Sequence, residues 1–130
     1  MLSHFLFYSL IMFLANSNLL FETFFLLMFG HFLADFPLQG DYLSRTKDPL
    51  KNEFGIWFIS MFAHSMIHAG VVFILTGSIV LAGFMLATHF FIDYAKCAGW
   101  FGKGTPAYTR DQIFHIVVLL MISIAYCQSL

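Results

Sequence analysis

The chain has 130 residues, of which 60% are hydrophobic and only 10% are charged, and its mean hydropathy is +0.83. A soluble domain carries about 25% charged residues, so these charges are too few to cover a globular surface in water. The length allows one domain, and the net charge of -1 gives no case for nucleic acid as a partner, because binding it needs a basic face that neutralises phosphates. The composition therefore predicts one integral membrane domain spanning residues 1–130.

The first hydrophobic segment, residues 1–15, is short for a bilayer core that needs about 20 helical residues. It is followed by Asn16, Ser17 and Asn18, which are favoured N-cap residues for a new helix. The segment ends like a signal peptide but lacks the basic region that begins one. We therefore expect a short N-terminal hydrophobic helix that is retained.

Four core membrane helices are expected next, at residues 19–37, 54–76, 79–98 and 110–128. Pro37 ends the first of them, because its ring pushes the preceding residue out of helical geometry. Only Thr76, Gly77 and Ser78 separate the second from the third, which requires an antiparallel helical hairpin. Backbone groups in lipid must be satisfied within each segment, so strands are excluded. The predicted fold class is all-α, a polytopic transmembrane helix bundle.

The few cations predict the orientation of the bundle. Lysine and arginine are concentrated in two connections, one after residue 37 and one before residue 110, as Arg45, Lys47, Lys51, Lys96, Lys103 and Arg110. By the positive-inside rule both connections face the cytoplasm, and the turn at residues 76–78 faces the other side with the C-terminus. We expect membrane lipids as neighbours; a homo-oligomer or a membrane-protein partner stays open.

Five of the six histidines lie four residues from another histidine or from an aspartate, and only His4 does not. A spacing of four places two side chains on one helix face, about 6 Å apart. Each of the four core helices carries one such pair: His31 and Asp35, His64 and His68, His89 and Asp93, and Asp111 and His115. Each core helix thus presents two metal-binding types of side chain on one face.

Ionisable groups at the centre of a membrane helix cost roughly 2.5–3.5 kcal/mol each, so these eight need compensation. Mutual hydrogen bonds and ion pairs are one form of compensation. We favour a divalent metal, because helix bundles with inward carboxylates and histidines at this spacing recur as metal scaffolds. Five histidines and three aspartates suit two ions; one ion with orienting His–Asp pairs stays the alternative. The lack of nearby thiolates favours zinc, manganese or iron.

The depth of the pairs is uneven along the expected helices. Three pairs fall near the cytoplasmic ends of their helices, whereas His64 and His68 lie two to four turns inside the helix at 54–76. They reach the level of the other pairs if that helix begins as an interfacial stretch around Trp57.

Four motifs follow one another along the chain: the stretch from Gly30 to Gln39, the helix with His64 and His68, the stretch from His89 to Lys96, and Asp111-Gln112 with His115. Together they resemble the DUF3307 family of small bacterial and phage membrane proteins. The resemblance covers roughly residues 26–115 and leaves the first helix outside. It implies a fold, a bacterial inner membrane, and a site made of the four pairs, but little about function.

A more distant likeness in the HxxxD pattern links the chain to the YdjM-type membrane proteins, which are described as metal-dependent hydrolases. By this resemblance the metal ligands would be His31, Asp35, His64, His68, His89, Asp93, Asp111 and His115. Gln39 and Gln112 would support the ligands or contact the substrate.

The leading hypothesis is therefore a metal-dependent hydrolase that acts on a lipid or phosphoester at the cytoplasmic headgroup level. Lys96, Lys103 and Arg110 would hold the anionic group. Asp35, Asp93 or Asp111 would serve as the catalytic base if it is not a ligand. A protein that binds or transports metal or protons stays open, although residues 71–85 are almost wholly apolar. A non-catalytic structural or regulatory membrane protein is the third possibility.

Overall fold

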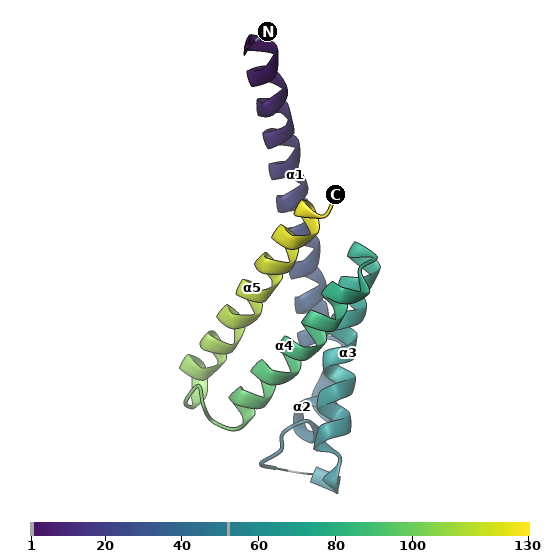
Figure 1. Ribbon diagram of the computed structural model, residues 1–130. Coiled ribbons are helices and arrows are strands. Elements are labelled where there is room, and N and C mark those ends of the chain that lie inside the picture. The colour runs from purple at the N-terminus through teal and green to yellow at the C-terminus, as the bar shows by residue number, and fades with distance from the viewer. Residues whose placement is uncertain (1, 52) are drawn as a thin grey trace.

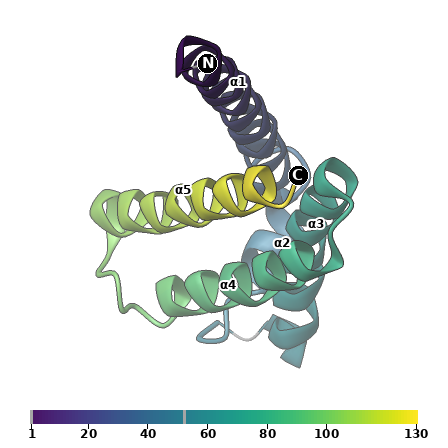
Figure 2. The ribbon, with the colours of Figure 1, turned by 45° about the horizontal axis from the view of Figure 1, so that its top comes forward.

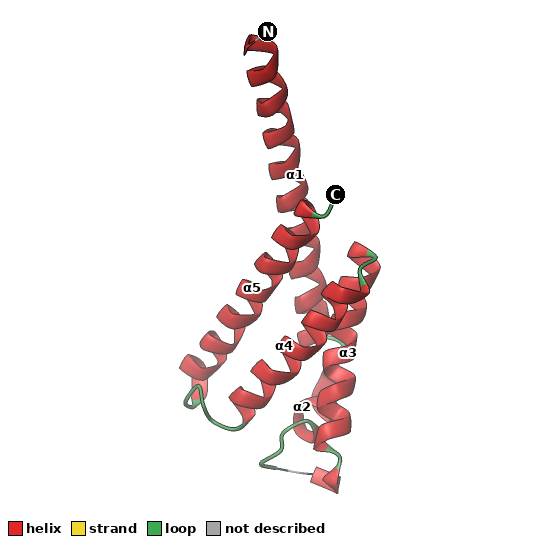
Figure 3. Ribbon diagram, in the orientation of Figure 1, coloured by secondary structure: helices red, strands yellow, loops and turns green. Residues whose placement is uncertain are grey.

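The protein is described by a computed structural model that covers residues 2–51 and 53–130, with side chains from residues 17–51 and 54–130. Within these residues every regular element is a helix and none is a strand (Figure 3). The elements are α1 (Leu2–Asp35), α2 (Gly40–Thr46), the 3-10 turn η1 (Glu53–Gly55), α3 (Trp57–Thr76), α4 (Ile79–Cys97) and α5 (Gly104–Gln128). Four stretches are long and apolar enough to cross a membrane: Ser17–Asp35, α3, α4 and α5. The predicted fold class is confirmed.

The two helices expected at residues 1–15 and 19–37 form one continuous helix, α1. Asn16, Ser17 and Asn18 lie inside it, because each lowers helix propensity by less than about 1 kcal/mol and residues 2–29 contain neither proline nor glycine to break the backbone. A helix of 34 residues is about 51 Å long, which exceeds the roughly 30 Å hydrocarbon core of a bilayer. The N-terminal half of α1 accordingly projects beyond the other helices (Figure 1).

The other helix boundaries differ from expectation by a few residues. α3 begins at Trp57 rather than residue 54, after a left-handed residue at Phe54 (φ 62°). α5 begins at Gly104, six residues before the expected Arg110. Pro106 lies in the first turn of α5, where the N–H that proline lacks would have no helical partner. The polar connection after α1 also contains the short helix α2.

The predicted hairpin of α3 and α4 is present, and the turn geometry explains it. Gly77 has a left-handed φ of 67°, and its N–H donates to the Phe73 carbonyl at 2.8 Å. Ser78 caps α4 by accepting from the Leu81 N–H at 3.3 Å. The two cation-bearing connections lie at one end of the bundle, and the hairpin turn and the C-terminus lie at the other end (Figures 1 and 2).

The distribution of side chains is inverted relative to a soluble protein. The outer surface exposes many large apolar side chains, such as Phe21 and Phe25 at 70% and Ile74 at 82%. The interior contains one apolar cluster and, beside it, buried histidines and aspartates. The apolar cluster includes Leu27, Val72, Met85, Leu119 and Ile122. An exposed apolar surface of this extent fits lipid as the surrounding solvent.

Candidate metal centre

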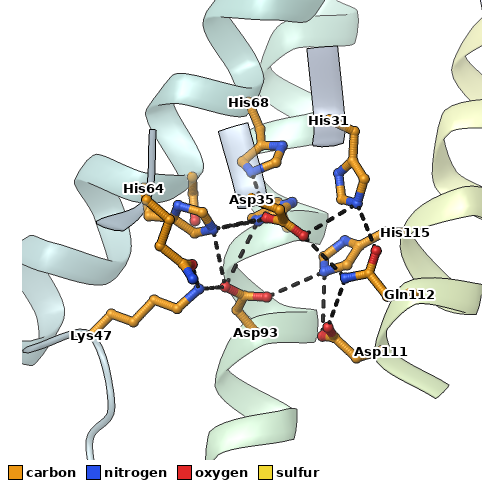
Figure 4. Close-up of polar contacts among 12 residues, drawn as sticks. His31, Asp35, Lys47, His64, His68, Asp93, Asp111, Gln112 and His115 are labelled. Atoms are coloured by element: carbon orange, nitrogen blue, oxygen red, sulfur yellow. Dashed lines mark hydrogen bonds and ion pairs between the residues drawn. The ribbon is translucent and has the colours of Figure 1, made fainter. Parts of the chain in front are cut away.

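The four predicted pairs converge in the interior of the bundle; Figure 4 labels all of their side chains except that of His89. All their side chains are buried except that of Asp35, which is 12% exposed. Asp35 is the last residue of α1 and lies beside both histidines of α3, so the expected difference in depth does not separate this pair from the others. Because α3 begins at Trp57 and not at residue 54, its two histidines lie closer to the start of the helix than expected. His4 lies outside the residues whose side chains are described.

One group of four side chains surrounds Asp35. Its Oδ1 lies 3.0 Å from His68 Nε2, 3.3 Å from His64 Nε2 and 3.9 Å from His89 Nε2. Ligand atoms from these four residues lie within 4.8 Å of one another and come from α1, α3 and α4. Three imidazoles and one carboxylate are a donor set that suits zinc, manganese or iron.

One ligand nitrogen in this group lacks the partner that a purely hydrogen-bonded core would provide. His68 Nε2 is buried and makes no hydrogen bond of acceptable geometry, although Asp35 Oδ1 is 3.0 Å away. His64 Nε2 and His89 Nε2 lie 3.2 Å apart and share a hydrogen bond, for which one of the two rings must carry its proton on Nε2. A cation between these nitrogens would satisfy all three lone pairs, so the donor set fits a metal ion.

A second group consists of His89, Asp93 and His115. Asp93 Oδ1 lies 3.2 Å from His115 Nε2, and Asp93 Oδ2 lies 3.4 Å from His64 Nε2. His89 Nε2 lies 3.9 Å from Asp35 Oδ1 and 3.8 Å from Asp93 Oδ2, and an imidazole nitrogen has one lone pair, so this nitrogen binds only one ion at a time. The two groups therefore compete for His89.

Two lysines neutralise two of the three carboxylates. The Lys47 ammonium is buried, forms an ion pair with Asp93 and donates to Gln39 Oε1 at 2.5 Å. The Lys96 ammonium donates to Asp111 Oδ2 at 2.8 Å. Among the described residues, no lysine or arginine pairs with Asp35.

His31 and Gln112 hold Asp35 from its other oxygen. His31 Nε2 lies 3.3 Å from Asp35 Oδ2 and 3.3 Å from Gln112 Oε1. The Gln112 amide donates to Asp35 Oδ2 at 3.1 Å and to Asp111 Oδ2 at 3.2 Å. His31 belongs to neither ligand group, and its contact with Asp35 Oδ2 suits a residue that orients this carboxylate.

Of the three remaining residues predicted for the site, two contact the centre through a neighbouring side chain and one does not. Gln39 reaches the centre through Lys47, and Lys96 reaches it through Asp111. Arg110 does not: its exposed guanidinium donates to the Phe101 carbonyl at 2.6 Å and so closes the connection between α4 and α5. The start of α5 at Gly104 places Arg110 on an outward face of the helix, next to the inward Asp111.

Lys47 is the residue that sequence reasoning missed. In the sequence it is one of the loop cations, with Arg45 and Lys51, that predict the orientation of the bundle. No periodic pattern marks it, because it lies in an irregular connection just after α2. Only the tertiary fold shows that its ammonium is buried against Asp93.

The centre opens toward the end of the bundle that carries the cationic connections. A cavity of about 140 Å³ is lined by both aspartates Asp35 and Asp93. A larger cavity of about 610 Å³ shares five lining residues with it: Gln39, Lys47, Asp93, Lys96 and Tyr108. On the opposite side, the space that Leu27, Val72 and Leu119 enclose beside His31 and His68 holds no water-sized volume. The centre is thus open at one end and sealed at the other.

Most of the chain matches the model of a known family. A model described as "Protein of unknown function (DUF3307)" matches residues 23–130. The chain belongs to the DUF3307 family. The match includes all four pairs and every helix from α2 to α5, and it begins inside α1. The N-terminal part of α1 lies outside the matched residues, as the resemblance led us to expect.

No curated protein and no solved structure matches this DUF3307 chain. The likeness to the YdjM-type hydrolases therefore remains a hypothesis.

Proposed function

We propose that the protein is a metal-dependent membrane hydrolase that acts on a lipid or phosphoester. One observation supports this most directly: Asp35 converges with three imidazole nitrogens beside a cavity that opens at the end of the bundle. The donor set suits zinc, manganese or iron. Manganese and iron prefer more than four ligands, so either would keep positions for water or substrate.

A divalent ion at this position would polarise a phosphoryl oxygen and make hydroxide available near neutral pH. Asp93 lines both cavities and is our choice for the general base, because Asp35 lies among the ligands and Asp111 lines neither. Hydrolysis would join the oxygen of water to phosphorus and break the bond to the ester oxygen. The proton that Asp93 accepts from water would pass to the leaving ester oxygen.

The substrate would be anionic, because lysines dominate the charged lining of the larger cavity. Lys47, Lys51, Lys96 and Lys103 line it, against the two carboxylates of Asp48 and Asp93. Ammonium groups bind phosphate oxygens through charge-assisted hydrogen bonds. By the positive-inside rule this end faces the cytoplasm of a bacterial inner membrane, at the level of lipid headgroups.

Transport of metal or protons has less support. A permeation path needs polar groups at successive depths. The centre is instead bordered by the apolar cluster of Leu27, Val72, Met85 and Leu119, and no water-sized space lies between them. A structural role, in which the metal only locks the helices together, is the alternative that the experiment must separate.

The first experiment is elemental analysis of detergent-purified protein beside the double variant His89→Ala/Asp93→Ala, which disrupts both groups. We expect zinc, manganese or iron in the wild type and none in the variant. The same samples are then assayed for release of phosphate or headgroup from phospholipids and soluble phosphoesters, with Asp41→Asn as a control at an exposed position of α2.

Hydrolysis by the wild type and the control, absent from the double variant, would support the proposal. Absence of metal from the wild type would leave a hydrogen-bonded polar core and end the hydrolase hypothesis. Metal without hydrolysis, together with unfolding when a chelator removes it, would establish the structural role instead.

A further inference from the structure

The three carboxylates of the centre are neutralised in different ways. Asp93 pairs with the Lys47 ammonium, and Asp111 pairs with the Lys96 ammonium at 2.8 Å. Asp35 contacts only imidazoles and the Gln112 amide among the described residues. With neutral imidazoles, Asp35 therefore carries the one carboxylate charge of the centre that is in contact with no ammonium.

This charge pattern determines how many divalent ions the centre can hold at low cost. One divalent ion with one anionic ligand from solvent or substrate would make the buried groups neutral overall. A second divalent ion would add uncompensated positive charge beside two buried ammonium groups. Uncompensated charge in a membrane interior is expensive, because the surroundings solvate it poorly.

The arrangement of the ligands also favours a single divalent ion. His89 belongs to both possible groups, and its Nε2 lies 3.2 Å from His64 Nε2 in the first. An ion bound beside Asp35 would therefore occupy His89 Nε2, and the group with Asp93 and His115 would lose its third donor. The Lys47 ammonium already contacts Asp93 Oδ2 at the edge of that second group.

We propose that Lys47 takes the place of a second metal ion. The centre binds one divalent ion at Asp35, His64, His68 and His89, and the Lys47 ammonium neutralises Asp93 where another ion would otherwise bind. Lys47 also lines both cavities, so its ammonium faces an entering anionic group as a second metal would. This inference rests on the proposed function for the presence of the first ion.

Removal of the ammonium would leave donors for a second ion. Asp93 and His115 would remain, and Asp111 Oδ1 lies 3.4 Å from His115 Nε2. That oxygen is buried and makes no hydrogen bond. Asp93 and His115 would then offer two donors at a position that Lys47 no longer neutralises, with Asp111 Oδ1 beside His115.

The test is the number of ions bound per chain. Metal-free protein in detergent is titrated with zinc and, separately, with manganese, and the bound metal is counted by elemental analysis. The variants are Lys47→Gln, which removes the charge, Lys47→Arg, which keeps it, and Lys51→Gln as the control. Lys51 lies four residues away with its side chain 62% exposed.

We expect one ion per chain in the wild type, Lys47→Arg and Lys51→Gln, and two in Lys47→Gln. Two ions in the wild type would overturn the inference, and so would a single ion in folded Lys47→Gln. If Lys47→Gln does not fold, the counts for the wild type and Lys47→Arg decide. Two ions in a wild type that hydrolyses phosphoesters would leave the proposed function standing, whereas no ion at all would remove the basis of both.

Discussion

Gly30 on α1 lies directly against Val71 on α3, so closely that a Cβ atom on Gly30 would stand 2.3 Å from Val71 Cγ1. This contact adjoins His31 and lies just over one helical turn from Asp35. The absence of a side chain at residue 30 therefore lets α1 approach α3 closely enough for Asp35 to reach His64 and His68.

Replacement of Gly30 by alanine should push α1 and α3 apart. We expect Gly30→Ala to lose about 1–3 kcal/mol of stability through overpacking. It should also bind metal more weakly, because Asp35 moves away from the imidazoles of α3. Thermal unfolding in detergent and metal titration measure the two effects.

Gly83→Ala is the matched control, because a Cβ atom there meets nothing within 4 Å. It should leave metal binding unchanged. Val71→Ala added to Gly30→Ala should restore part of the metal affinity. A Gly30→Ala protein as stable and as rich in metal as the wild type would contradict the role of this contact.

Asp35 should contribute more to metal binding than any other carboxylate of the centre. Asp35→Asn removes the negative charge of the carboxylate whose Oδ1 lies within 3.9 Å of three imidazole nitrogens. We expect its metal content to fall at least about tenfold, since a neutral amide is a poor ligand for a divalent ion beside imidazoles. Elemental analysis is the measurement.

The comparison for Asp35 is Asp111→Asn, because Asp111 is bound by Lys96 and Gln112 and belongs to neither ligand group. This variant should keep its metal. Equal loss of metal from both variants would mean that Asp111 is a ligand and that the division of the centre is incorrect.

The two histidines His31 and His68 should differ sharply. His68→Ala removes a member of the ligand group, so we expect it to purify without metal. His31→Ala removes only a contact that orients Asp35, so it should keep the site with affinity reduced about 10–100-fold. Competition titrations with a chelator of known affinity distinguish the two results.

His4→Ala is the control on the same helix. Its backbone lies about 40 Å along α1 from His31, at 1.5 Å per residue, which is too far to reach the centre of its own chain. Loss of metal from His4→Ala would show that a second copy of the chain contributes to the site.

The orientation of the bundle can be tested by labelling introduced cysteines. In a background with Cys97 and Cys127 replaced by serine, Lys103→Cys and Ser78→Cys place thiols at opposite ends of the bundle. By the positive-inside rule a membrane-impermeant maleimide added to intact cells should label Ser78→Cys only. Labelling of Lys103→Cys instead would place the centre on the outer side of the membrane.

The sequence by itself determined the helical membrane fold and the four paired positions. Long apolar segments leave helices as the structure that satisfies backbone groups in lipid, and a spacing of four residues places His31 with Asp35, or His64 with His68, on one face. These are local relationships that depend only on helix geometry. The turn at Gly77 was equally local, because two helices joined by so short a connection must be antiparallel.

Only the tertiary structure decided how the pairs are shared. It joined Asp35 of one pair with histidines of two others and moved His31 to an orienting position. It also buried Lys47 against Asp93 while leaving Arg110 at the surface. Such contacts depend on how helices distant in sequence pack, and on where an irregular connection returns, so no periodicity along the chain encodes them. α1 continues through Asn16 and Asn18, because their weak preference against helix yields to the helical residues on either side.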